Sequence, residues 1–327
     1  MMRGLATTAL LLVGVSSASA QRSHLLVITG LGGEPSYSAS FATSGGALVE
    51  AARRWSLPAK NVTWLVEDTS KHDGLSSGRS TREGIMAAFA ALTRNSQRGD
   101  TVLVVLIGHG SGEGIGSKLS VPGPDPTAQD YAGWLDALAG RIVVVVVAAS
   151  GGGDFLAVLS RPGRIVISAT KSATERNESL FGARWVQGLT GGEADANKDG
   201  RITVLESYLH ATAAVARAYE ADKRLMTEHA MLDDDGDGKG SAVPGADGST
   251  DGVLARRIGF GGPGASTDPR VVALVASRSA LEADVEALRR RKGDMAESAY
   301  LDALEGLVVR IAEISKQIRA LDGSKSP

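Results

Sequence analysis

The sequence contains no cysteine, few aromatic residues and, after its first twenty residues, no long apolar run. Without a thiol, the chain forms no disulfide and has no cysteine nucleophile. Apolar residues make up 43% of the 327 residues but aromatic residues only 4%, so the core is expected to consist mainly of aliphatic side chains. No later run reaches the roughly 20 apolar residues that a membrane-spanning helix needs.

Neither sign of charge is in large excess. The chain has 35 basic and 37 acidic residues and a formal net charge of −2 at pH 7. Proteins that bind nucleic acid or anionic membranes generally carry a strong basic excess. We therefore expect no nucleic-acid partner, and the partner that we predict is a protein or a peptide.

The first twenty residues have the pattern of a secretory signal peptide. Arg3 supplies a positive charge, an apolar stretch follows, and Ala18, Ser19 and Ala20 form a small-residue cleavage site. The apolar stretch is too short to span a bilayer. We expect residues 1–20 to be removed and the mature protein to be exported, either to the periplasm or as a secreted protein.

Short β-branched runs alternate with amphipathic helical patterns through the first two thirds of the chain. The predicted strands are residues 24–29, 62–66, 101–107, 141–149 and 165–169, and the predicted helices are residues 40–56, 80–92, 127–138, 178–189 and 204–222. The fourth strand contains five consecutive valines without polar alternation, which is typical of a central strand covered on both faces. The alternation predicts an α/β fold, with a parallel sheet and helices on both of its faces.

Three regions follow the signal peptide. Residues 21–235 are predicted to form the α/β domain. Residues 236–268 are rich in Gly, Ser and Pro and lack periodicity, which predicts a flexible linker. Residues 269–322 carry apolar stripes at helical and heptad spacing, which predicts a helical hairpin or a short coiled coil. We expect this last region to be structural and to provide a surface for self-association.

Glycine-rich turns follow the third and fourth predicted strands. His109 and Gly110 follow the third strand, and Ser150 and Gly151 follow the fourth. The carboxyl ends of parallel strands meet at one edge of a sheet, where α/β proteins place their functional sites. A histidine beside a nucleophile suits base-activated acyl transfer, and glycines allow backbone N–H groups to approach an oxyanion.

These motifs resemble those of the caspase–hemoglobinase fold, in particular the legumain-type and bacterial caspase-like peptidases. In that family a His-Gly pair follows one strand and an Ala-Cys-x-Ser-Gly sequence follows the next. His109 and Gly110 match the first motif, and Ser150 and Gly151 match the end of the second. The resemblance covers roughly residues 24–225. It implies a caspase-like α/β fold in which the histidine activates the nucleophile and the Gly110 N–H helps to form the oxyanion hole.

The family's nucleophile aligns with Ala148, which has no nucleophilic atom. The resemblance therefore implies a non-catalytic pseudopeptidase that acts by binding, with His109 and Ser150 left as vestiges of an active site. In an alternative hypothesis, Ser150 is the nucleophile of an active hydrolase and His109 is its base, although the sequence favours a small residue that caps the next helix as the role of Ser150. A third hypothesis is a structural envelope protein that works through its coiled coil.

Residues 195–206 have the pattern of an EF-hand calcium loop. Short oxygen-bearing side chains occupy loop positions 1, 3 and 5, Gly200 stands at the sharp turn, and a glutamate closes the loop at position 12. The predicted ligands are Asp195, Asn197, Asp199, Arg201 through its carbonyl, Thr203 through a water, and Glu206. A single loop of this kind in an exported protein predicts a structural calcium ion rather than a sensor.

A second acidic stretch, residues 233–238, repeats the first half of this pattern. Asp233, Asp235, Asp237 and Gly238 are in register with the first loop, but its twelfth position holds a proline, which offers no side-chain ligand. The stretch predicts either half of a calcium loop, which another segment would have to complete, or a solvated acidic turn.

The remaining polar features are assigned no site. Helix capping by Asn177, with Glu178 in the first turn, explains the acidic stretch that begins at Glu175. The histidines other than His109 have no partners at metal-ligand spacing.

Overall fold

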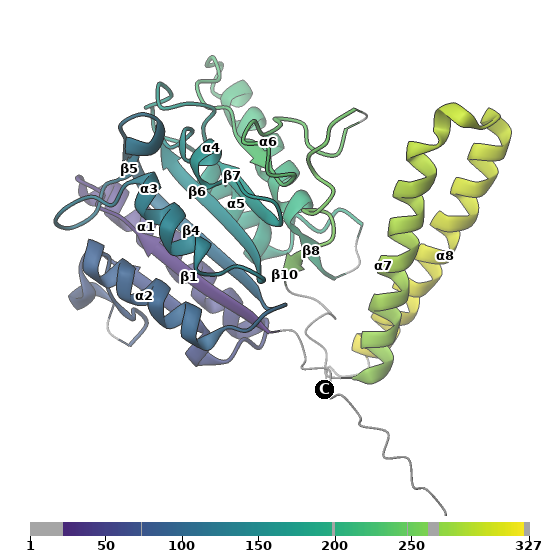
Figure 1. The fold of residues 1–327 in the computed structure, drawn as a ribbon, viewed down its shortest axis with the longest axis horizontal. Helices are drawn as coiled ribbons and strands as arrows, with labels where there is room; N and C mark the ends of the chain where they lie inside the picture. The colour runs from purple at the N-terminus through teal and green to yellow at the C-terminus, as the bar shows by residue number, and fades with distance from the viewer. Residues whose placement is uncertain (1–21, 73, 198–199, 247, 261–267, 324–327) are drawn as a thin grey trace, which may run out of the picture.

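The computed structural model describes residues 22–72, 74–197, 200–246, 248–260 and 268–323, which form an α/β domain followed by a helical hairpin (Figure 1). The predicted signal peptide lies outside the described residues, and so do residues 261–267 of the predicted linker. Within the described part of the chain, no helix is both long and apolar enough to cross a bilayer.

A central sheet organises the α/β domain. Its strand order is β3-β2-β1-β4-β6-β7-β9, and β5 pairs with β4 outside this order. The pairs from β3 to β7 are parallel, whereas β9 and β5 run antiparallel to their neighbours, so the sheet is mostly, not entirely, parallel as predicted. The strands are β1 (Ser23–Thr29), β2 (Val62–Val66), β3 (Gly78–Arg79), β4 (Thr101–Ser111), β5 (Lys118–Leu119), β6 (Ile142–Ser150), β7 (Arg164–Ser168) and β9 (Met231–Asp233). A separate antiparallel pair consists of β8 (Ile202–Thr203) and β10 (Gly259–Phe260).

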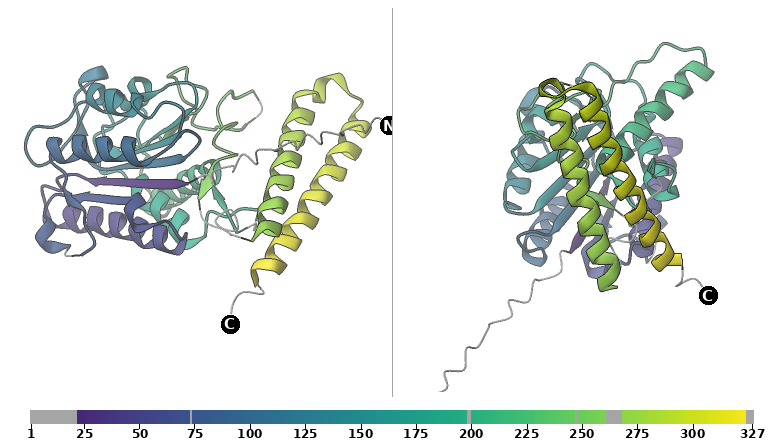
Figure 2. Two further views of the ribbon diagram at one scale, coloured as in Figure 1. Left: turned by 60° about the horizontal axis from the view of Figure 1, so that its bottom comes forward. Right: turned by 90° about the vertical axis from the view of Figure 1, so that its right-hand side faces the viewer.

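Helices cover both faces of the sheet, as Figures 1 and 2 show. One face packs against α1 (Pro35–Arg54), α5 (Phe181–Gly191) and α6 (Val204–Ala221). The other face packs against α2 (Arg82–Asn95), α3 (Ala128–Asp136) and α4 (Phe155–Leu159). Short 3₁₀ helices are η1 (Ala59–Asn61), η2 (Thr69–Lys71), η3 (Gly114–Gly116) and η5 (Lys292–Asp294).

The central strand β6 is buried on both faces. Its valines at positions 143 to 147 are at most 3% exposed. Because side chains alternate along a strand, Val144 and Val146 enter the core beneath α1 and α5, whereas Val143, Val145 and Val147 enter the core beneath α3 and α4. A strand that is covered on both sides needs apolar residues at every position, which is why this run shows no polar alternation.

A capping box and an ion pair tie α2 to α3. The predicted capping pair is confirmed, since Asp130 N–H donates to Thr127 Oγ1 at 3.2 Å and Thr127 N–H donates to Asp130 Oδ2 at 2.7 Å. Arg82 donates to both oxygens of Asp130, at 2.6 and 2.5 Å. The hydrogen bond from Arg82 is the largest cause that lowers the pKa of Asp130 to about 2.

The described residues 236–246 and 248–260 pack onto the α/β domain, whereas their composition predicts a flexible linker. The buried carboxylate of Asp234 accepts hydrogen bonds from the N–H groups of Gly252 and Ala255, at 2.8 and 2.7 Å. Phe260 is 6% exposed and lies in the core beneath α1. The composition does not predict this packing, because hydrogen bonds to the buried carboxylate of Asp234, rather than an apolar run, hold the segment.

The C-terminal helices α7 (Pro269–Arg290) and α8 (Glu297–Gly323) pack against each other as a hairpin. The carboxylate of Asp268 caps the start of α7. Leu281 and Leu288 are 5% and 8% exposed, so the side of α7 that carries them is buried. Figures 1 and 2 show the hairpin as a body distinct from the α/β domain.

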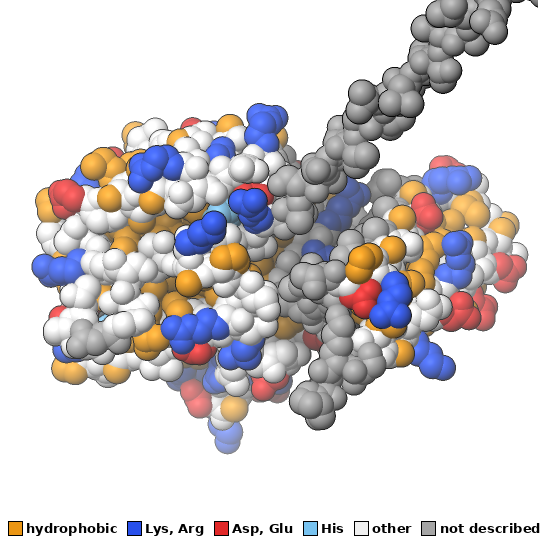
Figure 3. All heavy atoms as spheres, turned by 90° about the horizontal axis from the view of Figure 1, so that it is seen from below, with side chains coloured by type: hydrophobic (Ala, Val, Ile, Leu, Met, Phe, Trp, Pro, Cys, Tyr) orange, Lys and Arg blue, Asp and Glu red, His pale blue; other side chains and the backbone are white. Residues whose placement is uncertain are grey.

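Charged side chains of both signs lie on the surface. Figure 3 shows Lys and Arg side chains interspersed with Asp, Glu and apolar side chains over the face seen from below Figure 1. This mixing agrees with the nearly balanced formal charge of −2.

We expect Arg82→Met to make the protein less resistant to acid. Because the pKa of Asp130 in the folded protein is lowered, its carboxylate stabilises the fold above about pH 4, and this contribution is lost as the pH falls toward 2. Without Arg82 the pKa of Asp130 rises, and the midpoint of acid unfolding, followed by circular dichroism, moves to higher pH. Arg53→Met, which breaks an exposed pair with Glu50, is the control. An equal movement of the midpoint in both variants would contradict the prediction.

Candidate functional site

His109 and Ser150 meet where two parallel strands end. β4 and β6 are neighbours in the sheet, and their register pairs His109 with Ser150. The imidazole Nδ1 lies 3.2 Å from Ser150 Oγ, within hydrogen-bonding distance. A general base must lie about this close to the proton that it removes. The structure therefore brings together the two residues that the sequence offers as base and nucleophile.

Ala148 lies two residues before Ser150 in β6. It pairs with Ile107 rather than with His109. Its methyl group lies against Gly182 of α5, where an added Cβ would stand 2.8 Å away from it. Side chains two residues apart point to the same face of a strand, so Ala148 and Ser150 share a face. Ser150 is therefore the side chain next to the imidazole of His109. The family's nucleophile, in contrast, aligns with Ala148.

A cleft of about 320 Å³ opens beside this pair, between α1 and the start of α5. The imidazole packs edge-on against Tyr37 and Phe41 of α1, with ring centroids 4.9 and 5.2 Å from its own. The charged side chains of Glu178 and Arg184 also line the cleft. Ser150 is only 6% exposed, so the cleft is the route by which a ligand would reach its hydroxyl.

Two glycines let the strand ends come this close. A Cβ on Gly110 would stand 2.7 Å from the carbonyl oxygen of Ser150, which is closer than van der Waals contact permits. Gly151 has a φ of +62°, a conformation that glycine adopts without strain. Its N–H donates to the carbonyl oxygen of Glu175 at 2.7 Å, so this N–H group is already engaged.

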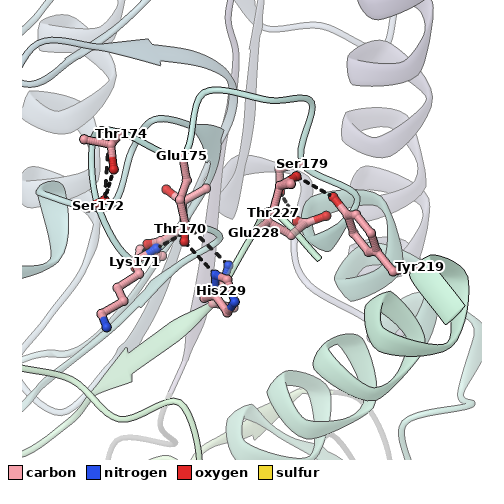
Figure 4. A network of polar contacts seen from close by, with 12 residues as sticks. Thr170, Lys171, Ser172, Thr174, Glu175, Ser179, Tyr219, Thr227, Glu228 and His229 are labelled. Atoms are coloured by element: carbon pink, nitrogen blue, oxygen red, sulfur yellow. Dashed lines mark hydrogen bonds and ion pairs between the residues drawn. The ribbon is translucent and has the colours of Figure 1, made fainter. Parts of the chain in front are cut away.

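Glu175 joins this turn to a distant segment through His229 (Figure 4). Glu175 Oε1 lies 2.6 Å from His229 Nδ1. Glu175 Oε2 accepts hydrogen bonds from the N–H groups of His229 and Lys171, at 3.0 and 2.9 Å. Glu175 and His229 are 54 positions apart in the sequence, so no local pattern links them and neither is predicted as a site residue. Their contact anchors the loop whose carbonyl holds Gly151.

The neighbouring Glu228 caps the helix that forms one wall of the cleft. Its carboxylate accepts hydrogen bonds from the N–H groups of Leu180 and Phe181, at 2.8 and 3.1 Å, and from the Ser179 hydroxyl at 2.6 Å. Glu228 is 3% exposed, and a carboxylate at a helix N-terminus is favoured by the free N–H groups and by the helix dipole. Glu228 thus holds the start of α5, which forms one wall of the cleft. His229 holds the loop that contains Glu175.

The predicted calcium loop contains the expected turn. Gly200 has a φ of +83°, and its N–H donates to Asp195 Oδ2 at 2.8 Å. Glu206 Oε2 accepts hydrogen bonds from the N–H and the hydroxyl of Thr203, at 2.9 and 2.8 Å, in a capping box at the start of α6. Carboxylate, hydroxyl and carbonyl oxygens are the donors that Ca²⁺ prefers, so the residues fit this ion. Asp199 lies outside the described residues.

The other two described ligand positions flank this turn. Asn197 is exposed. The guanidinium of Arg201, whose backbone carbonyl is the predicted ligand, donates to the carbonyl oxygen of Arg257 at 2.9 Å. This bond fastens the loop to the segment that enters β10.

The second acidic stretch contains the same turn. Gly238 has a φ of +79°, and its N–H donates to Asp233 Oδ2 at 2.6 Å, as Gly200 does to the first residue of its loop. Carboxylate oxygens of Asp233, Asp235 and Asp237 lie within 4.8 Å of one another, with Asp233 buried and the other two exposed. This group has the donors to hold a metal ion, but carboxylates alone do not select calcium over other hard cations.

No protein-family model matches the chain, and no curated protein matches it. Among solved structures, the chain is similar to the crystal structure of protein GSU0716 from Geobacter sulfurreducens, with 13% sequence identity and a TM-score of 0.40. The likeness covers 59% of this chain and 89% of that chain. A likeness this weak carries no inference about function, so function has to be argued from the residues of the cleft and the loops.

Gly110→Ala is expected to destabilise the fold and to separate His109 from Ser150. The added Cβ would meet the Ser150 carbonyl oxygen at 2.7 Å, so one strand end must move. Overpacking of this kind costs about 1–3 kcal/mol, which thermal unfolding measures. Gly116→Ala is the control, because an added Cβ there meets nothing within 4 Å. Equal melting temperatures for the two variants would contradict the close approach of the strand ends.

Proposed function

We propose that the mature, exported protein is a serine hydrolase, in which Ser150 attacks the acyl group of a peptide or ester and His109 is the base. The observation that carries this proposal is the 3.2 Å approach of His109 Nδ1 to Ser150 Oγ at the side of a cleft. A serine hydroxyl becomes a useful nucleophile when an adjacent base takes its proton.

In the proposed reaction, His109 Nδ1 accepts the hydroxyl proton as Ser150 Oγ attacks the carbonyl carbon of the substrate. The imidazolium then gives that proton to the departing amine or alcohol, which leaves an acyl-serine. Water, deprotonated by the same nitrogen, hydrolyses the acyl-serine and restores the free hydroxyl. The rings of Tyr37 and Phe41, packed against the imidazole, keep Nδ1 directed at Oγ through both steps.

The resemblance to caspase-like peptidases supports the same cleft by a separate route. In that family the base follows one strand of a parallel sheet and the nucleophile follows the next, and His109 and Ser150 stand at the ends of the adjacent strands β4 and β6. The family's cysteine aligns with Ala148, so a hydrolase built on this chain is of the serine type.

A fluorophosphonate probe, which reacts with activated serines, tests this proposal. We expect the probe to label Ser150, identified by mass spectrometry of the digested protein. Ser150→Ala should abolish labelling and ester hydrolysis, and His109→Ala should slow both by roughly 10²–10⁴-fold, the usual contribution of a general base. Ser40→Ala is the control, because it removes another hydroxyl that lines the same cleft. Absence of labelling, or labelling that persists in Ser150→Ala, would sink the proposal.

A second candidate is a non-catalytic cleft that binds a protein or peptide, as a pseudopeptidase would. Two observations favour it. Among the described residues, the imidazole of His109 has no hydrogen-bond partner other than Ser150, so no carboxylate orients it as in a catalytic triad. The Gly151 N–H is already bonded to Glu175, which removes one donor for an oxyanion. If the cleft only binds, we expect peptides to bind without being cleaved and the fluorophosphonate probe to leave Ser150 unlabelled.

We also propose that calcium stabilises the α/β domain by binding to residues 195–206. The turn in which Gly200 N–H donates to Asp195 supports this, because an EF-hand loop needs a sharp turn at its sixth position, which Gly200 occupies. An ion that binds the folded chain and not the unfolded one raises the free energy of unfolding. The same capping box that starts α6 holds Glu206 at the end of the loop.

Calcium is expected to raise the melting temperature relative to a sample with chelator. With a dissociation constant of about 10⁻⁴ M, typical of extracellular sites, roughly 10 mM calcium adds about 2.7 kcal/mol to the free energy of unfolding. Asp195→Ala should remove most of the shift, measured by differential scanning calorimetry. Asp222→Ala, which removes an exposed carboxylate paired with Arg224, should retain it. No shift in the wild type would contradict calcium binding, and a shift lost only in Asp235→Ala would place the ion in the second acidic stretch.

A further inference from the structure

Helix α8 carries an apolar stripe that α7 leaves uncovered. Leu301, Val308 and Val309 are 53%, 50% and 49% exposed, and Ala312 is exposed beside them. On a helix of 3.6 residues per turn, side chains seven or eight positions apart lie on one face, so these residues form one stripe. Figure 3 shows apolar side chains on the surface of the hairpin between charged ones. A different side of α8 carries Tyr300, which is 8% exposed, so the stripe is a second apolar face that the hairpin does not bury.

The charges on this stripe are separated along the helix. Glu305 lies four residues from both Leu301 and Val309 and therefore on the stripe, in its N-terminal half. Lys316 lies seven residues beyond Val309, on the same face and in the C-terminal half. Both side chains are exposed. The stripe thus has Glu305 in its first half, an apolar middle and Lys316 in its second half, while the exposed Glu313, four residues beyond Val309, lies at its edge.

We propose that this stripe binds the same stripe of a second copy of the chain, with the two α8 helices antiparallel about a two-fold axis near residue 310. In this arrangement Val308 and Val309 of both copies pack around the axis. Glu305 of each copy then faces Lys316 of the other copy. The interface is isologous, as in most homodimers. The sequence predicts self-association through residues 269–322, and this proposal assigns it to one face of α8.

The order of the charges selects the antiparallel arrangement. A parallel pair would place Glu305 opposite Glu305 and Lys316 opposite Lys316, and like charges across an interface oppose association. Glu305 and Lys316 are eleven residues apart on one helix, about 16 Å along its axis, so they cannot pair within one chain. Any energetic coupling between them therefore reports a contact between two copies.

Sedimentation equilibrium of the mature chain, residues 21–327, tests the proposal. We expect a monomer–dimer equilibrium, in which Val308→Asp raises the dissociation constant at least about tenfold because it buries a carboxylate from each copy in the apolar contact. Gln317→Asp is the matched control, because it adds the same charge on the opposite, exposed side of α8 and should change the constant less than about twofold. Circular dichroism of both variants shows whether the hairpin stays helical.

Charge reversal tests the orientation separately. Glu305→Lys alone and Lys316→Glu alone should each raise the dissociation constant about three- to tenfold, and the double reversal should return it to within about twofold of the wild type. A wild-type chain that stays monomeric at about 100 μM, well above the dissociation constants of stable dimers, overturns the proposal. A dimer that withstands Val308→Asp, or a double reversal no tighter than the single ones, also overturns it.

Discussion

The register between β4 and β6 is the constraint on which the candidate site depends. The two strands stay paired from Thr101 and Ile142 to His109 and Ser150 without a slip. A slip of one residue would turn every side chain of β6 to the opposite face and would remove Ser150 from the imidazole. The five valines alone do not oppose such a slip, because a shift by one residue puts one valine in place of another and both faces of β6 are apolar. Polar contacts at the two ends of β6 do oppose it, since Arg141 donates to the carbonyl oxygen of Ser96 and the Gly151 N–H donates to that of Glu175, both at 2.7 Å. These end contacts hold Ser150 opposite His109, while the valines stabilise the sheet.

The acidic loops and the cleft are supported by one continuous stretch of chain. The predicted calcium loop leads into α6, and the segment after α6 contains Glu228, which caps α5, and His229, which holds Glu175. That segment continues into β9, whose last residue, Asp233, begins the second acidic turn. A cation bound in either loop, as proposed for residues 195–206, would restrain one end of this stretch. Such binding would be coupled to the geometry of the cleft through the backbone.

Local signals in the sequence were sufficient for most of the fold, and contacts between distant residues were not. The five valines, the capping pair at Thr127 and the helical pattern of residues 269–322 each rest on neighbours in sequence, and each corresponds to an element of the structure. The pairing of Glu175 with His229 and the ordering of residues 236–260 by Asp234 depend on where the chain returns in space. The motifs also brought His109 and Ser150 to the same edge of the sheet. They did not give the register, and so they could not decide between Ala148, which aligns with the family's nucleophile, and Ser150, which faces His109 in the structure.

The absence of cysteine excludes thiol chemistry but does not exclude hydrolysis by a serine. A cysteine thiol and a serine hydroxyl differ in how much they depend on a neighbouring base. A thiol ionises readily and keeps much of its reactivity without a base in contact, whereas a serine hydroxyl needs a base that takes its proton as it attacks. The contact between His109 and Ser150 meets that requirement. The rings of Tyr37 and Phe41 orient the imidazole, but they do not stabilise its positive charge as a carboxylate does. In serine proteases, removing the negative charge of the triad aspartate lowers the rate by about 10⁴-fold. An amide needs the imidazolium to protonate its leaving group, while an activated ester depends on this step much less. As the proposed hydrolase, the cleft would be better matched to esters than to peptide bonds, because no carboxylate among the described residues bonds to the imidazole of His109.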